Sequence, residues 1–105
     1  MKEATVRKEG DTLIAELTCE IDHHTAKTVR EAVDEALFSM RPRSLVLDFS
    51  GVAFMDSSGI GLIIGRVDKA ESVGAAVRIR GLCRALSKVV RLSGIEKIKN
   101  LTIEP

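Results

Sequence analysis

Apolar and polar residues alternate with a period of two near the start of the chain. Residues 11–18, DTLIAELT, place Leu13, Ala15 and Leu17 on one face, and the weaker alternating run ATVRKEG precedes them across a Gly10-Asp11 turn. Two such runs around a glycine-containing turn predict a β-hairpin.

The apolar period lengthens to that of a helix in residues 25–40. The positions recurring every three or four residues are Val29, Ala32, Val33, Ala36, Leu37 and Met40. This spacing predicts an amphipathic helix of about four turns. Pro42 should end it, because proline lacks the amide donor and biases the preceding residue away from helical geometry.

Strand and helix patterns continue to alternate to the end of the chain. We expect strands at 44–49, 76–81 and 97–104, and helices at 57–72 and 83–94, with Gly74 and Gly94 as their terminators. The helix between two strands favours a crossover to a parallel neighbour. The sequence therefore predicts an α/β protein with a mixed sheet covered by helices, in one domain spanning 1–105.

The composition and charge of the chain argue against direct binding of nucleic acid. The chain is 45% hydrophobic and 30% charged, with a formal net charge of +1 and no Trp or Tyr. The N-terminal residues 1–65 carry 7 Lys/Arg and 11 Asp/Glu, whereas residues 66–105 carry 9 and 4. Since the basic residues look spread out without clustering, we expect no direct binding of nucleic acid.

The sequence also lacks the patterns typical of a membrane span or of a redox site. No apolar run approaches the ~20 residues that cross a bilayer, and no signal peptide precedes the domain. Cys19 and Cys83 lack the spacing of a metal or redox pair. We expect a cytoplasmic protein in which both cysteines are reduced packing residues.

The run FMDSSGIGLIIGR, residues 54–66, is the most informative stretch, and three chemistries compete for it. A serine hydrolase needs a G-x-S-x-G elbow and a histidine base, but Met55 stands where the first glycine belongs for Ser57. A phosphate-binding loop matches neither glycine-rich fingerprint, and no lysine follows. The simplest structural account is that Asp56 or Ser57 caps the following helix.

Capping leaves the composition of that helix unexplained. Its first turns combine Gly59, Gly61 and Gly65 with aliphatic residues on nearly every side, so the segment is either fully buried or partly presented to a partner. A serine at this position could also be a switch. The helix dipole tolerates a phosphate, whereas a dianion beside Asp56 would oppose docking of a partner.

Three motifs together resemble the anti-sigma factor antagonist family of STAS domains. They are FMDSSGIGLIIGR, CEIDHHTA at 19–26 and VVRLSGI at 89–95, in this order over essentially the whole chain. The resemblance implies a mixed sheet of four to five strands covered by helices and no catalytic activity of its own. It implies partner switching, in which the protein binds an anti-sigma factor that is also a serine kinase and frees a sigma factor.

The same resemblance assigns roles to residues. Ser57 would be the phosphorylated serine, with Asp56, Ser58 and Gly59 forming the phosphorylation loop. The kinase, of the GHKL type, would supply its own bound ATP, and a PP2C-type phosphatase would restore the serine. From the residues alone, Ser57 and Ser58 remain equal candidates, because either could lie near the helix start.

Residues 20–25, EIDHHT, precede the first expected helix. Asp22 or Thr25 is expected to cap that helix. A histidine pair could suggest a metal, but adjacent side chains diverge and no third ligand is spaced nearby, so we expect neither metal nor cofactor. In the resembling family this loop lies beside the phosphorylation loop.

The predicted partner-binding residues therefore come from both motifs. They are Asp22, His23, His24, Thr25, Ile60, Gly61 and Ile64. Cys19 departs from the glycine that relatives commonly carry at that position. An alternative function on the same fold is an accessory or scaffold subunit of a transporter or of a stress-signalling complex.

Overall fold

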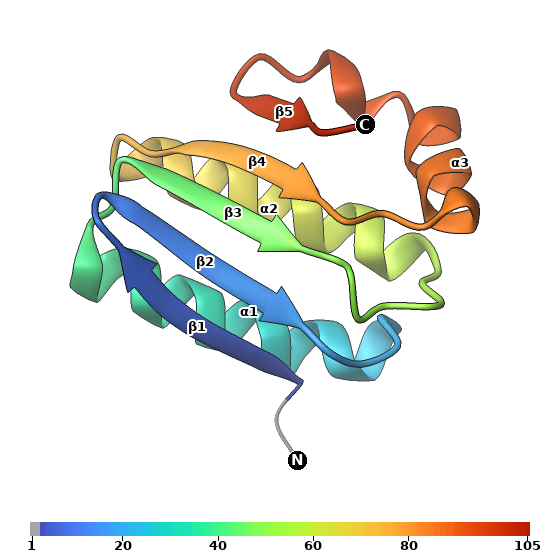
Figure 1. Cartoon of the computed structure of the whole chain (residues 1–105), viewed down its shortest axis with the longest axis horizontal. Helices are drawn as coiled ribbons and strands as arrows, with labels where there is room; N and C mark the ends of the chain where they lie inside the picture. Colours follow the sequence, from blue (N-terminus) through green and yellow to red (C-terminus); the bar gives the residue numbers. More distant parts are fainter. Residues whose placement is uncertain (1–2) are drawn as a thin grey trace.

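The computed structural model describes residues 3–105, so the first two residues of the expected 1–105 domain lie outside the described part. Strands and helices alternate along it (Figure 1). In chain order the elements are β1 (Ala4–Glu9), β2 (Thr12–Leu17), α1 (His23–Met40), β3 (Ser44–Asp48), α2 (Ser57–Ser72), β4 (Ala76–Arg80), α3 (Arg84–Ser93), the 3-10 helix η1 (Ile95–Lys97) and β5 (Leu101–Ile103).

The strands form one five-stranded sheet in the order β1-β2-β3-β4-β5. β1 pairs antiparallel with β2 as the predicted hairpin, and the remaining neighbours pair in parallel. Parallel neighbours need a crossover, which α1 supplies between β2 and β3 and α2 supplies between β3 and β4. The predicted mixed sheet is confirmed, and with five strands it reaches the upper end of the expected range.

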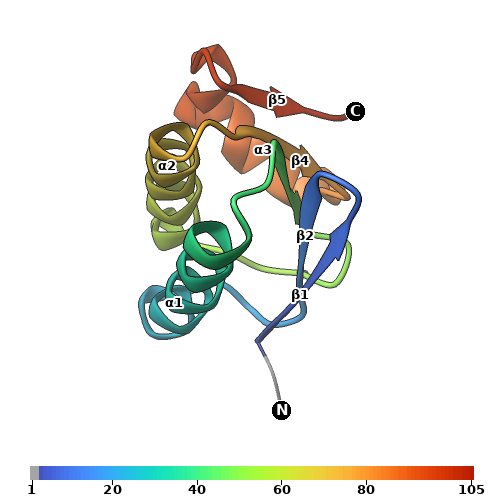
Figure 2. The ribbon, with the colours of Figure 1, turned by 90° about the vertical axis from the view of Figure 1, so that its left-hand side faces the viewer.

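The helices α1 and α2 lie side by side on one face of the sheet (Figure 2). Alternate residues of the central strands, such as Leu13 and Leu47, point into this layer and are fully buried. The predicted apolar stripe of α1 meets them through Val29, Val33 and Leu37. The core is therefore the space between the sheet and these two helices, and burial of this stripe is what holds α1 in place.

The opposite face of the sheet carries a row in which charge flanks apolar residues. In register across the sheet lie Arg7, Ile14, Val46 and Arg78, and the two central residues are only 4% and 2% exposed. Arginine stems cover apolar surface while their charged ends stay in water. The two arginines thus shield the apolar row on this face of the sheet, which neither α1 nor α2 covers.

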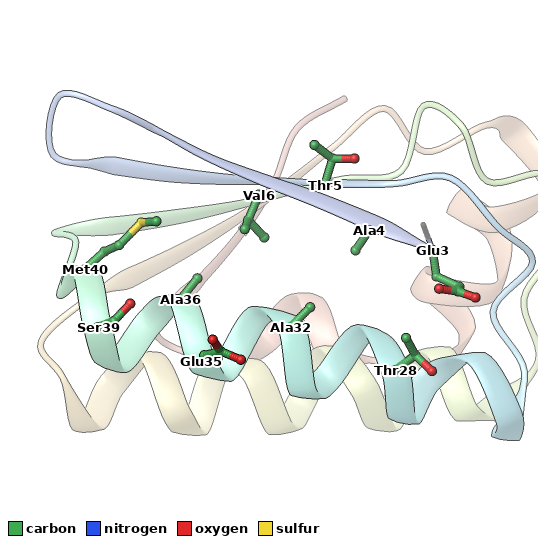
Figure 3. Close-up of a pocket in the computed structure, with 10 residues that line it drawn as sticks. All are labelled: Glu3, Ala4, Thr5, Val6, Thr28, Ala32, Glu35, Ala36, Ser39 and Met40. Atoms are coloured by element: carbon green, nitrogen blue, oxygen red, sulfur yellow. The ribbon is translucent and has the colours of Figure 1, made fainter. Parts of the chain in front are cut away.

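The packing of α1 on the edge strand β1 is looser. A groove of about 450 Å³ runs between them, and Figure 3 shows Val6 and Ala4 pointing from the strand toward Ala32 and Ala36 of the helix. Three of these four side chains are alanines, which are too short to close the gap. None of the predicted site residues lines this groove.

The C-terminal strand is shorter than predicted, and the prediction is wrong for the first half of residues 97–104. Residues 95–97 form η1, and only Leu101–Ile103 pair with β4. Asn100 interrupts the run, because its side-chain amide donates a hydrogen bond of 2.8 Å to the Ala75 carbonyl at the start of β4. An alternating pattern fits such a turn as well as it fits a strand.

Two smaller expectations are also corrected. The helix α1 begins at His23 rather than at Thr25, because Asp22 caps it, so the histidines belong to its first turn. Cys83 is exposed at the start of α3 and is not a packing residue, whereas Cys19 is half-buried. Among residues 3–105 no helix is both long enough and apolar enough to span a membrane.

A polar network joins the ends of β3 and β4. Asp48, 8% exposed, accepts hydrogen bonds from the Ser50 amide at 2.9 Å, from the Ser50 hydroxyl at 2.6 Å and from Arg80 Nε at 3.0 Å. Burial acts to raise the pKa of Asp48, but the bonds from Ser50 and Arg80 outweigh it and hold the pKa below 3.8. This network sets the point from which the loops to α2 and α3 leave the sheet.

Gly81 should be far less replaceable than Gly74, although both have a φ near 78°, a region that strains any residue with a Cβ. A Cβ on Gly81 would lie 2.8 Å from the Ser50 amide and 2.9 Å from Asp48 Oδ1, whereas one on Gly74 meets nothing within 4 Å. We expect Gly74→Ala to lower the free energy of unfolding by about 1 kcal/mol. Gly81→Ala should lower it by about 3 kcal/mol, because it also disrupts the Asp48 bonds. Urea denaturation measures both free energies of unfolding. Equal losses in the two variants would show that the Asp48 network adds nothing to the cost of replacing Gly81.

Candidate functional site

A two-residue bridge outside the named strands joins the DHHT and DSSG loops. Ile21 pairs in parallel with Met55, through hydrogen bonds from the Ile21 amide to the Phe54 carbonyl at 3.0 Å and from the Asp56 amide to the Ile21 carbonyl at 3.1 Å. Both paired side chains are buried in the core, at 0% and 4% exposure. The two motifs, more than thirty residues apart in sequence, therefore lie side by side at the carboxyl ends of β2 and β3.

Asp22, one of the two residues predicted to cap α1, is its N-cap and follows this bridge directly. Its Oδ1 accepts hydrogen bonds from the His24 amide at 2.8 Å and from the Thr25 amide at 2.9 Å, and the Asp22 amide donates to Thr25 Oγ1 at 3.0 Å. This is a reciprocal capping box, in which Thr25 takes the place of the usual Glu or Gln. His23 and His24 consequently stand exposed on the first turn.

The cap also sets the charge state of Asp22. The hydrogen bond from the Thr25 amide, helped by that from His24, holds the pKa of the Asp22 carboxyl below 3.8. Asp22 therefore stays ionised at neutral pH, and it offsets the positive end of the α1 dipole.

Asp56 caps α2 without a capping box, accepting a single hydrogen bond of 2.8 Å from the Ser58 amide. Ser57 is then the first helical residue and is exposed, whereas Ser58 is half-buried. No hydrogen bond holds the Ser57 hydroxyl to any part of the chain between residues 3 and 105. No hydrogen bond holds the Ser58 hydroxyl within the described residues either, so the two adjacent serines differ in exposure, and Ser57 is the more exposed.

The first turns of α2 are partly exposed to solvent. The sequence left open whether this segment is fully buried, and the structure shows that it is not. Leu62 and Ile63 are buried in the core, while Ile60 is half-buried and Ile64 is 45% exposed. Ile64 therefore adds apolar surface outside the core, about two turns beyond the serines.

The glycines of α2 differ in what surrounds them. A Cβ on Gly59 would lie 2.5 Å from Met55 Sδ, so this glycine makes room for the bridge residue. Gly61 and Gly65 meet nothing within 4 Å and instead line open space. Gly59 is thus required by packing inside the chain, whereas Gly61 is not.

That open space is a groove of about 470 Å³ between α1 and α2. His23, Lys27 and Arg30 of α1 form one wall, and Ser58 and the two glycines of α2 form the other. Arg66 also lines the α2 wall, but its guanidinium is paired with Asp34, whereas no ion pair holds His23, Lys27 or Arg30 within residues 3–105. The groove would attract carboxylate or phosphate groups.

The two walls are tied together beneath the groove by an ion pair. Arg66 of α2, 3% exposed, places Nε 2.8 Å from Asp34 Oδ1 of α1, without hydrogen-bond geometry. Burial raises the pKa of Asp34 despite the nearby guanidinium. Removing Asp34 would leave the buried Arg66 charge uncompensated, so this pair fixes α1 relative to α2.

Phe54, Lys27 and Arg30 belong to this region and were not predicted. Phe54 is 51% exposed directly before the buried Met55. Strand-like alternation through the bridge faces the two side chains in opposite directions, a signal that was present in the sequence. The two cations follow the DHHT motif by less than two helical turns, but only the position of α2 shows that they line a groove.

Within residues 3–105, no three His, Cys, Asp or Glu side chains are grouped so that they could hold a metal ion. The chemistry that the site offers consists of an exposed hydroxyl, two capping carboxylates and a basic groove.

Comparison with known proteins identifies this arrangement. The sequence model of the STAS domain matches residues 3–104. The chain belongs to the STAS domain family. Its relatives include an anti-sigma F factor antagonist of Paenibacillus polymyxa, 35% identical over 86 residues that cover 82% of this chain and 74% of the relative. The corresponding protein of Lysinibacillus sphaericus is 31% identical over 85 residues, with coverage of 81% and 73%.

Solved structures of a STAS protein agree with the fold. The unphosphorylated form of the anti-sigma factor antagonist SpoIIAA superposes with a TM-score of 0.71 at 23% identity, covering 97% of this chain and 88% of that one. The phosphorylated form of the Bacillus protein SpoIIAA gives 0.71 at 25% identity, with coverage of 97% and 91%. The family predicted from the three motifs is confirmed.

The lowered pKa of Asp22 should be visible as a pH-dependent part of the stability. A carboxyl whose folded pKa lies below its unfolded value stabilises the fold above that value and loses the contribution as the pH falls through the folded pKa. We expect Asp22→Asn, which can still cap, to unfold more easily than the wild type at pH 6 and to approach it below about pH 3. Urea unfolding midpoints across pH measure this, and a gap that stays constant down to about pH 2 would contradict it.

Proposed function

We propose that this STAS domain is an anti-sigma factor antagonist that acts by partner switching. The unphosphorylated form binds an anti-sigma factor serine kinase of the GHKL type and thereby releases a sigma factor. Transfer of the γ-phosphoryl group from the ATP held by that kinase to Ser57 abolishes binding, and a PP2C-type phosphatase reverses the modification. The domain itself performs no chemistry, and its partners place it in the cytoplasm.

One observation carries the proposal: Ser57 is exposed, unbonded within the described chain, and fixed beside the DHHT turn by the Ile21–Met55 bridge. A kinase can reach such a hydroxyl without unfolding anything. The names of the relatives and the two forms of SpoIIAA support the same function.

The docking surface would combine both loops and the exposed side of α2. We assign to it Asp22, His23, His24, Thr25, Ile60, Gly61 and Ile64. Ile64 offers apolar area, and Gly61 keeps the groove open for a partner side chain. The basic wall of α1 favours an acidic residue of the kinase in that groove.

Phosphorylation would act on this surface and not on the fold. A dianion on Ser57 lies at the positive end of the α2 dipole, where the host helix tolerates it. The same dianion stands next to the Asp56 carboxylate, and Ser58 beside it lines the groove. It would repel acidic groups of the partner and compete with them for Lys27 and Arg30, so the complex would separate.

Substitutions at Ser57 test the proposal directly. We expect Ser57→Ala to fold normally and to bind the cognate kinase like the wild type, but to accept no phosphate. Ser57→Asp should bind at least about tenfold more weakly, because it places a charge in a surface that must be desolvated. Titration calorimetry measures the affinities, and mass spectrometry after incubation with kinase and ATP locates the phosphate.

Ser58→Ala is the matched control, since it removes the neighbouring hydroxyl and leaves Ser57 in place. It should still be phosphorylated, at Ser57. Equal kinase affinity for Ser57→Asp and the wild type would refute the switching mechanism. Phosphate found only on Ser58 would refute the choice of acceptor.

A further inference from the structure

The helix α3 gathers three cations on one side, contrary to the expectation that basic residues are spread without clustering. Arg84, Lys88 and Arg91 are exposed at spacings of four and three residues, which share one face of a helix. Leu86 and Val90, exposed by only 2% and 1%, anchor the other side of α3 in the core. The orientation of the basic face is thus fixed by packing.

This basic face borders exposed apolar surface. Leu92 is 81% exposed, and with Leu82 it helps line a groove of about 590 Å³ along α3 that also contains the three cations. A leucine so exposed at the rim of a groove contributes nothing to the core. The groove is therefore both cationic and apolar.

The charge of the groove is not neutralised by the protein. No ion pair joins Arg84, Lys88 or Arg91 to a carboxylate of residues 3–105, although five other arginines of the described chain each have one. The surrounding C-terminal part has 9 Lys/Arg against 4 Asp/Glu in residues 66–105. An occupant with carboxylates would complement this field.

We infer that the α3 groove is a docking site for an acidic segment of a partner protein, which carries carboxylates against Arg84, Lys88 and Arg91 and an apolar side chain against Leu82 and Leu92. None of the three phenylalanines lines the groove, so it offers no stacking platform for nucleic acid bases. A ten-residue helix with a single strongly exposed leucine offers little apolar area to a membrane.

This site is separate from the surface that contains Ser57. No residue lines both the α3 groove and the groove between α1 and α2. Both views place α3 on the far side of the molecule from α1, toward β5 (Figures 1 and 2). The inference does not rest on the proposed function, because no residue that lines the α3 groove belongs to the surface assigned to the kinase.

The probe is a fluorescein-labelled helical peptide with three glutamates at the spacing of the α3 cations and two leucines beside them. Fluorescence anisotropy measures its binding to the full chain at low and moderate salt. We expect binding that weakens with salt, and that weakens about fivefold when both peptide leucines are replaced by serine.

Variants of the protein locate the site. Arg84→Glu/Lys88→Glu/Arg91→Glu should reduce peptide affinity at least about tenfold, because three attractive charges become repulsive. Lys8→Glu/Lys69→Glu/Lys99→Glu makes the same change of formal charge elsewhere and should reduce it less than about threefold. Leu92→Ala should weaken binding about fivefold, and Ser57→Asp should leave it unchanged.

Four results would overturn the inference. They are equal losses in the two triple variants, no effect of the leucines, tighter binding of anionic vesicles or of a single-stranded oligonucleotide than of the peptide, and self-association in sedimentation that the α3 triple variant abolishes. The last would assign the groove to a second copy of the chain. Circular dichroism of each variant separates loss of binding from loss of fold.

Discussion

The pairing of Ile21 with Met55 is the constraint on which the site depends. β2 and β3 end their register at Glu16 and Asp48, and their chains rejoin at this bridge after both have left the sheet. Each helix then starts at the second residue after a bridge residue, so the positive ends of two helix dipoles are held side by side. Such ends repel, and the two capping carboxylates, Asp22 and Asp56, offset the repulsion. One pair of buried side chains thereby positions both motifs.

Tolerance of negative charge follows from the same arrangement. Two helix starts and the cations of α1 create a local excess of positive potential around Ser57, so added negative charge is stabilised by the fold that carries it. Acidic groups of an approaching partner would compete with the added negative charge for the same cations, so the added charge would weaken binding. A modification can therefore be neutral for folding and unfavourable for binding, provided that it stands at the rim of the contact and not beneath it.

Much of this could be read from the sequence, because periodicity and capping are local. Apolar spacing gave α1, the Gly10 turn gave the hairpin, and the acid before each helix was one of two candidates for its cap. What failed depended on tertiary contacts. Alternation in residues 97–104 could not show that Asn100 bonds to Ala75, nor could spacing along α1 show that Lys27 and Arg30 face α2 across a groove. The family resemblance and the composition of the second helix suggested which residues bind a partner, but only the three-dimensional arrangement could show that Gly61 lines a groove and does not pack inside.

The buried pair of Arg66 and Asp34 explains why the groove between α1 and α2 is already open in the isolated chain. Glycines on α2 leave room for α1 to approach closely, which would close the space beside Gly61 and Gly65. Here a long guanidinium side chain lies between the two helices and is held by its carboxylate across the gap, so the helices are kept apart where apolar packing alone would draw them together. The desolvation of both charges costs stability that a hydrophobic pair of similar volume would not. A preformed groove lets a partner side chain enter without first separating the helices, which lowers the cost of binding. The pair is thus better understood as a spacer that keeps the proposed docking surface open than as a source of stability.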